Sequence, residues 1–70
     1  MERKKVSSSK IRSVGYDERA QTLEVEFNNG SVMQYSRAST DLHRRMMNAG
    51  SVASFFEDNI QDTFSEKRMR

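Results

Sequence analysis

The chain has 70 residues, a formal net charge of +2, and neither cysteine nor proline. A chain of this length forms one domain at most and buries only about 60% of its unfolded surface, so we expect modest stability. The lack of cysteine excludes a disulfide and a thiolate metal site. No stretch approaches the ~20 apolar residues that a membrane span requires, and no apolar run follows the start. We therefore expect a cytoplasmic protein with no membrane partner.

Both ends of the chain are predicted to lie outside the folded domain. Charged residues and then serines fill residues 1–8, which is the composition of a flexible basic arm. Residues 66–70 are predicted to form a basic C-terminal tail. The single domain is therefore expected to span residues 9–65.

Residues 10–17 and 23–27 are predicted to form the first two strands of an antiparallel sheet. In the second of these, apolar residues alternate with glutamates, which is typical of a strand with one packed face and one wet face. In the first, Ile11 and Val14 have the wrong parity for one flat face. Gly15 indicates a β-bulge, which would correct that parity.

The turn between the second and third strands decides which side chains of the third strand reach the core. Asn29-Gly30 indicates a tight hairpin turn, because both residues tolerate positive φ. A two-residue loop puts Val32 on the packed face. A three-residue loop with Gly30 in a bulge shifts the pairing by one residue and puts Met33 and Tyr35 there instead. We favour the three-residue loop, because it buries a methionine and a tyrosine.

Two short amphipathic helices are predicted after the third strand. Ser39 or Thr40 can cap the start of the first helix, and Gly50 is expected to end it in a left-handed conformation. Ser51 can cap the second helix directly afterwards. The apolar residues of the second helix form one arc and its acidic residues fill the other side.

The core is predicted to lie between the sheet and these helices. Phe56 is near the middle of the apolar arc and is expected to pack on Val25 or Phe27. The order of elements predicts an α+β domain, in which a three-stranded antiparallel meander is followed by a helical hairpin packed on one sheet face.

No residue set in the chain encodes a recognisable reaction. His43 is the only histidine, and neither a second histidine nor a cysteine lies at metal-binding spacing, so neither a zinc site nor a catalytic triad can be built around it. Glu24 and Glu26 are interpreted as the wet face of a strand and not as a catalytic carboxylate pair. We therefore predict a binding module that is not an enzyme and has no metal or cofactor.

Binding is the class of function that remains. The basic residues that we predict to carry it are Arg3, Lys4, Lys5, Lys10, Arg12, Arg37, Arg44 and Arg45. A nearby aromatic such as Tyr16 or Tyr35 would suit single-stranded nucleic acid, through phosphate pairing and base stacking. The glutamates of the second strand make the open sheet face acidic, so the helix side and the termini are favoured over that face. The alternative is that these cations form a solvated surface with no ligand.

The sequence from Ser9 to Asp17 resembles the opening motif of the KTSC domain family, Ser-x-Ile-x-x-Val-Gly-Tyr-Asp. The likeness continues to about Phe64 through Leu23-Glu24-Val25-Glu26-Phe27, Gly30, Tyr35, Ala49, Ser51, Phe55-Phe56 and Ile60. The family is named for its place at the C-terminus of some lysyl-tRNA synthetases, and it also occurs as small stand-alone proteins of bacteria and phages. The resemblance therefore implies RNA as a ligand.

The sequence departs from the family pattern in three places. The central Tyr-x-Tyr of the family falls on residues 33–35, where Met33 replaces the first tyrosine. The usual Val-Pro falls on residues 38–39, which are Ala-Ser, and a usual glycine falls on Ala53. If the tyrosine pair stacks bases, half of that platform is missing here. If the pair packs in the core, methionine adapts to the gap, and the substitution favours this structural role.

Two functions therefore stay open. The first is a small RNA-binding or other nucleic-acid-binding module that acts through phosphate contacts. The second is a protein-interaction module with no nucleic-acid role, either a homodimer or a phage-type adaptor that docks on a host protein. Salt dependence separates them, because phosphate-driven binding weakens steeply as salt rises.

Overall fold

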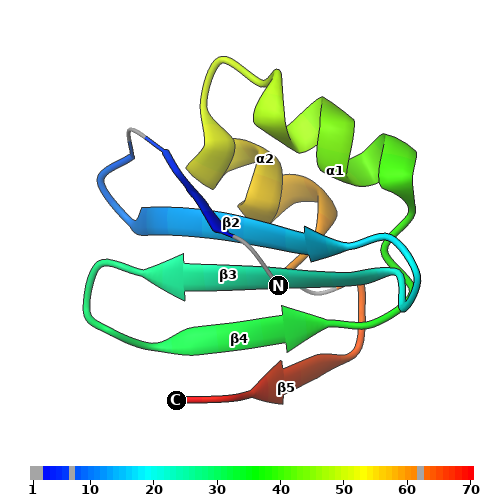
Figure 1. Ribbon diagram of the computed structural model, residues 1–70. Coiled ribbons are helices and arrows are strands. Elements are labelled where there is room, and N and C mark those ends of the chain that lie inside the picture. The colour runs from blue at the N-terminus through cyan, green and yellow to red at the C-terminus, as the bar shows by residue number, and fades with distance from the viewer. Residues whose placement is uncertain (1–2, 7, 62) are drawn as a thin grey trace.

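The structure is a computed structural model that describes residues 3–6, 8–61 and 63–70. Its elements are β1 (Arg3–Lys5), β2 (Ile11–Asp17), β3 (Thr22–Phe27), β4 (Val32–Tyr35), α1 (Thr40–Met47), α2 (Val52–Asn59) and β5 (Glu66–Arg68). The strands form one five-stranded antiparallel sheet in the order β1-β2-β3-β4-β5, with both helices inserted between β4 and β5 in the chain (Figure 1). The α+β class is confirmed, but the sheet is larger than the predicted three-stranded meander.

The two additional strands come from the two ends of the chain. β1 pairs with β2, and β5 pairs with β4. The boundaries that left residues 1–8 and 66–70 outside the folded domain are therefore wrong for these strands, whereas Met1, Glu2 and Ser7 lie outside the described residues. Such short charged segments carry no alternation signal. The edges of the central meander order them, because β2 and β4 offer backbone groups that require hydrogen-bond partners.

The β3–β4 hairpin has the three-residue loop. Gly30 adopts φ 92°, and its N–H donates to the carbonyl oxygen of Phe27 at 3.0 Å. The N–H of Phe27 donates in turn to the carbonyl oxygen of Ser31 at 2.8 Å. This closure places Met33 and Tyr35 opposite residues of β3 that face the core, so the favoured register is confirmed.

The β-bulge of β2 lies at Arg12 and not at Gly15. The pairing with β3 shifts between Ile11 and Ser13, which allows Ile11 and Val14 to share the packed face. The predicted correction of parity is therefore present, but its predicted position is wrong. The inserted residue is an exposed arginine, so the bulge costs the core no apolar side chain.

Both helices begin at the serines expected to cap them. The hydroxyls of Ser39 and Ser51 each accept a backbone N–H from the residue three positions further on. α1 ends at Met47, earlier than predicted. Asn48 follows with φ −96°, and its N–H donates to the carbonyl oxygens of Arg44 and Met46. The left-handed ending predicted at Gly50 is therefore wrong. Neither helix in the described residues is long and apolar enough to cross a membrane.

The helices cover one face of the sheet and close the core (Figure 1). Phe56 of α2 is 4% exposed, and its ring meets those of Phe27 and Tyr35 edge to face, with centroids 5.5 and 5.4 Å apart. The predicted packing of Phe56 on Phe27 is confirmed. Met46 of α1 is fully buried beside them. Tyr35 is a core residue, and its hydroxyl donates to Glu66 Oε2 of β5 at 2.7 Å.

Candidate nucleic-acid interface

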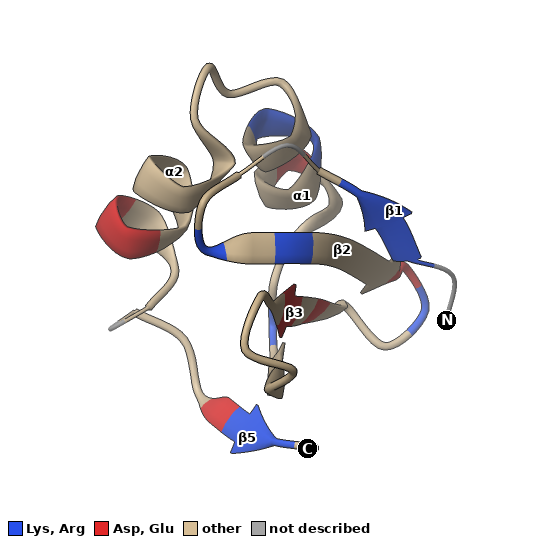
Figure 2. Cartoon of the chain, turned by 90° about the vertical axis from the view of Figure 1, so that its left-hand side faces the viewer, with Lys and Arg blue, Asp and Glu red and all other residues tan. Residues whose placement is uncertain are grey.

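The basic residues singled out in the sequence do not form one patch. Figure 2 shows Lys and Arg on β1, β2, α1 and β5, on different sides of the molecule. Lys10 forms an ion pair with Glu57 of α2, and Arg12 donates to the carbonyl oxygen of Asn28 at 3.3 Å. Arg37 lies in the connection from β4 to α1, with φ 64°. The structure thus gives these three cations separate surroundings.

Arg44 and Arg45 are exposed side by side on α1, and both pair with Asp41. The Arg45 Nε atom lies 3.7 Å from a carboxylate oxygen of Asp41, and Arg44 Nη2 contacts the other oxygen. Pairs of this kind contribute about 0.5 kcal/mol or less and are screened by salt. The two arginines therefore stay accessible to an anion, but Asp41 offsets about half of their charge.

The sheet face opposite the helices carries a charge network. Arg3 Nε lies 3.4 Å from Glu24, and Arg70 Nη2 lies 3.2 Å from Glu26. The Ser13 hydroxyl donates to Glu26 at 2.8 Å, and this hydrogen bond, helped by the nearby arginines, holds the pKa of Glu26 below its usual value. The expectation of an acidic open face is therefore wrong, because each carboxylate is paired with an arginine from one end of the chain.

Gly15 allows one of these ion pairs to form. It stands between Arg3 and Glu24 in the same row across the sheet, where neighbouring strands are ~4.8 Å apart. Because glycine has no side chain, Arg3 can reach over β2 to the carboxylate. Lys5 lies in the next such row, opposite Ser13. Arg3 and Lys5 therefore belong to the open face and not to the helix side.

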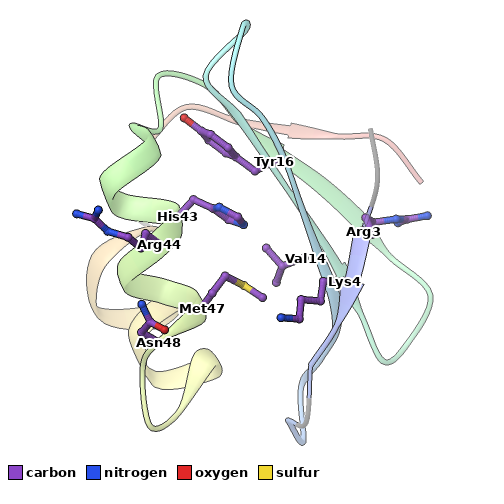
Figure 3. A pocket seen from close by; sticks show the side chains of 8 residues that line it. All are labelled: Arg3, Lys4, Val14, Tyr16, His43, Arg44, Met47 and Asn48. Carbon is purple, nitrogen blue, oxygen red and sulfur yellow. The ribbon is translucent and has the colours of Figure 1, made fainter.

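The alternation of β1 turns Lys4 to the helix side, where a cleft opens between β1, β2 and α1 (Figure 3). The cleft has a volume of about 720 Å³. Met47 of α1 gives it a half-buried apolar wall, Val14 of β2 lies buried at its floor, and the Lys4 side chain points toward them. Its other lining residues are Arg3, Tyr16, His43, Arg44 and Asn48. Figure 3 shows the Arg3 side chain directed away from the cleft.

A stacked aromatic pair borders the cleft. The rings of Tyr16 and His43 are nearly parallel, with centroids 4.8 Å apart and 8° between their planes. The Tyr16 hydroxyl donates to the carbonyl oxygen of Ala38 at 2.6 Å, which fixes the orientation of its ring. Burial lowers the pKa of His43, and the charge of Glu18 opposes this only in part, so the imidazole is neutral at pH 7. No group of three potential metal ligands gathers in the described part of the chain.

The aromatic surface of the protein is not the one that the family motif indicated. Tyr35 is 1% exposed and Met33 packs against the core, so these positions serve the interior. Tyr16 is a candidate stacking residue from the sequence, where no pattern links it to His43. The spacing of His43 and Met47 at i and i+4 does place both on one helix face. Only the packing of α1 against β2 brings that face to Tyr16.

Comparison with known proteins agrees with this fold. The KTSC domain family matches residues 7–64. An uncharacterised protein of Stutzerimonas stutzeri strain A1501 is 36% identical over 56 residues, which cover 80% of this chain and 79% of that protein. The crystal structure of a KTSC domain protein from Yersinia pestis has a TM-score of 0.93 at 34% identity, covering 99% of this chain and 97% of that chain. The chain therefore belongs to the KTSC domain family.

Proposed function

We propose that this protein is a non-enzymatic module that binds single-stranded RNA. The observation that carries the proposal is the cleft, in which the Lys4 side chain lies beside apolar walls and the Tyr16–His43 stack. Proteins bind single-stranded nucleic acid by pairing cations with phosphates and by offering flat side chains on which unpaired bases stack. The cleft brings a cation, an apolar side chain and the edge of an aromatic pair together in one place.

The cations around the cleft support the same ligand. Arg3 is engaged by the two glutamates of β3, whereas no ion pair holds Lys4 among the residues that the structure describes. Arg44 and Arg45 lie on the adjoining helix, where both pair with the single carboxylate of Asp41. A strand that leaves the cleft along α1 would therefore meet cations.

The test is a fluorescence-anisotropy titration of labelled single-stranded RNA at two salt concentrations. We compare the wild type with Arg44→Gln/Arg45→Gln and with the charge-matched control Lys67→Gln/Arg68→Gln on β5, the opposite edge of the sheet. Glutamine is chosen because glutamate would add two carboxylates beside Asp41. Log K falls as log salt rises, and each lost phosphate contact makes this slope shallower by about 0.7–0.9. The helix variant should therefore bind more weakly and with a flatter slope.

Two results would contradict the proposal. Undetectable binding by the wild type at low salt would exclude a nucleic-acid role and favour interaction with a protein partner. Equal weakening in the α1 and β5 variants would show that net charge, and not the surface beside the cleft, drives binding.

A further inference from the structure

We propose that the cleft between β1, β2 and α1 is a binding site for one nucleoside monophosphate unit. Lys4 holds the phosphate, and the base lies on the Met47 side chain, against the edge of the Tyr16–His43 stack. The inference rests on the proposed function and narrows it, because it states which parts of a nucleotide are recognised and where. It also predicts that a free mononucleotide binds.

The size of the cleft suits a ligand of this class. Its volume of about 720 Å³ lies within the ~300–1,000 Å³ typical of sites for small organic molecules. A bare phosphate or a metal ion would leave most of such a space to water. The entrance is open, so a nucleotide that is part of a strand can enter without losing its neighbours.

The chemistry of the walls requires a ligand with both a flat ring and an anion. Figure 3 shows the side chains of Val14, Met47 and Lys4 all directed into the space between the sheet and α1. Apolar side chains make no favourable contact with an inorganic anion, and a single ammonium group makes none with an apolar ligand. The thioether of Met47 makes favourable contacts with aromatic rings, so a base is better suited to this wall than an aliphatic group.

The aromatic pair adds fixed polar groups at the edge of this space. The Tyr16 hydroxyl donates to the carbonyl oxygen of Ala38 and lies 3.5 Å from the Thr40 hydroxyl, so the Tyr16 ring is held before any ligand arrives. The neutral imidazole of His43 has one donor and one acceptor nitrogen, and the Asn48 amide at the rim offers the same two functions. These groups can hydrogen-bond to the edge of a base.

Lys4 is the cation that the structure assigns to the phosphate. Arg44 also lines the cleft, but its guanidinium pairs with Asp41, and Figure 3 shows it directed outward from α1. Lys5 follows Lys4 directly in β1 and faces the other side of the sheet. The two neighbouring lysines therefore form a matched pair, in which the same change of charge is made inside and outside the cleft.

The experiment is an NMR titration of the isotope-labelled protein with adenosine 5′-monophosphate, adenosine and inorganic phosphate. We expect adenosine 5′-monophosphate at millimolar concentrations to shift the signals of Lys4, His43 and the Met47 methyl group. Adenosine and phosphate should each bind about tenfold more weakly or worse, because each offers only half of the recognised chemistry.

Three variants locate the site. Lys4→Gln should weaken binding of adenosine 5′-monophosphate by about tenfold, whereas Lys5→Gln should leave it unchanged. Met47→Trp should abolish binding of both the nucleotide and adenosine by filling the cleft without changing its charge. Amide spectra of each variant show whether the fold is retained.

Several results would overturn the inference. These are equal weakening by Lys4→Gln and Lys5→Gln, shifts that spare the Met47 methyl group, and full binding by a folded Met47→Trp variant. RNA binding without nucleotide binding in the cleft would remove this inference and leave the proposed function standing. Nucleotide binding without RNA binding would contradict the proposed RNA-binding function and support the cleft as a site for free nucleotides.

Discussion

At the scale of single residues, Tyr35 shows how one position of the family motif serves the fold. Its ring is buried against Phe56, and its hydroxyl reaches Glu66 on β5. Burial, followed by this hydrogen bond and the charge of Glu66, raises the pKa of Tyr35 far above its usual value. The phenol therefore stays neutral and joins the core to an edge strand, so it is not a platform for bases.

Phe56→Ala should destabilise the protein by about 3–5 kcal/mol, which is a large part of the stability of a domain this small. The reason is that Phe56 fills the space between α2 and the rings of Phe27 and Tyr35. Urea unfolding followed by circular dichroism measures the loss, with Ala49→Gly outside both helices as a mild control. A cooperatively folded variant of nearly unchanged stability would contradict this account of the core.

At the scale of secondary structure, the sequence predicted the elements that carry a periodic signal. Alternation identified β3, the turn chemistry of Gly30 selected the register of β4, and the serine caps located both helix starts. β1 and β5 carry no such signal, because each has three exposed residues. β1 is ordered by its pairing with β2 and by the Arg3–Glu24 ion pair, and β5 by its pairing with β4 and by the Tyr35–Glu66 hydrogen bond.

The candidate site could be predicted only in part for the same reason. Charge alone pointed to Lys4 and Arg44, but it also pointed to Lys10, which is held by α2 at another part of the surface. The stacking of Tyr16 on His43 joins two elements that are distant in the sequence. No local pattern encodes that contact.

Removal of residues 66–70 should lower the free energy of unfolding by about 1–3 kcal/mol, since hydrogen bonds contribute ~1 kcal/mol each and charged ones more. The truncation deletes β5, the hydroxyl partner of Tyr35 and the arginine that pairs with Glu26. Thermal unfolding measures the effect. Lys67→Ala/Arg68→Ala, which keeps the strand backbone, should retain most of the stability. A truncated chain as stable as the full one would show that β5 contributes nothing.

At the scale of the whole molecule, the carboxylates of β3 form ion pairs with arginines from both ends of the chain. Glu26 lies within 4.0 Å of Arg3 and 3.2 Å of Arg70, so one side chain on β3 contacts residues from both termini. The helix side carries the cleft, and the opposite side carries this network. The two faces of the sheet therefore separate the proposed binding cleft from the ion pairs of the chain ends.

The lowered pKa values of His43 and Glu26 predict that the free energy of unfolding falls in acid in two stages. The folded-state pKa of His43 is lowered, so the unfolded chain takes up a proton first and stability falls as the pH drops below about 6.5. The folded-state pKa of Glu26 is also lowered, so its contribution is present above its ordinary value of 4.5 and is lost below it. Urea unfolding across this pH range measures both stages.

Two variants assign the stages. His43→Gln should remove the decline that begins near pH 6.5 and leave the lower one. Glu26→Gln should flatten the decline below pH 4.5 and leave the upper one. An unchanged profile in either variant would contradict the assignment of that stage.

The cationic character of both sheet edges has a consequence for how copies of the protein meet. An exposed strand edge is a template on which another chain can aggregate by continuing the sheet. Here one edge presents Arg3, Lys4 and Lys5, and the other presents Lys67 and Arg68 beside one carboxylate, Glu66, so both edges are net positive. Every edge-to-edge encounter of two copies therefore brings like charges together. This repulsion is screened as the Debye length falls from about 10 Å at 0.1 M salt to about 3 Å at 1 M, so concentrated salt removes the barrier to fibre-like association.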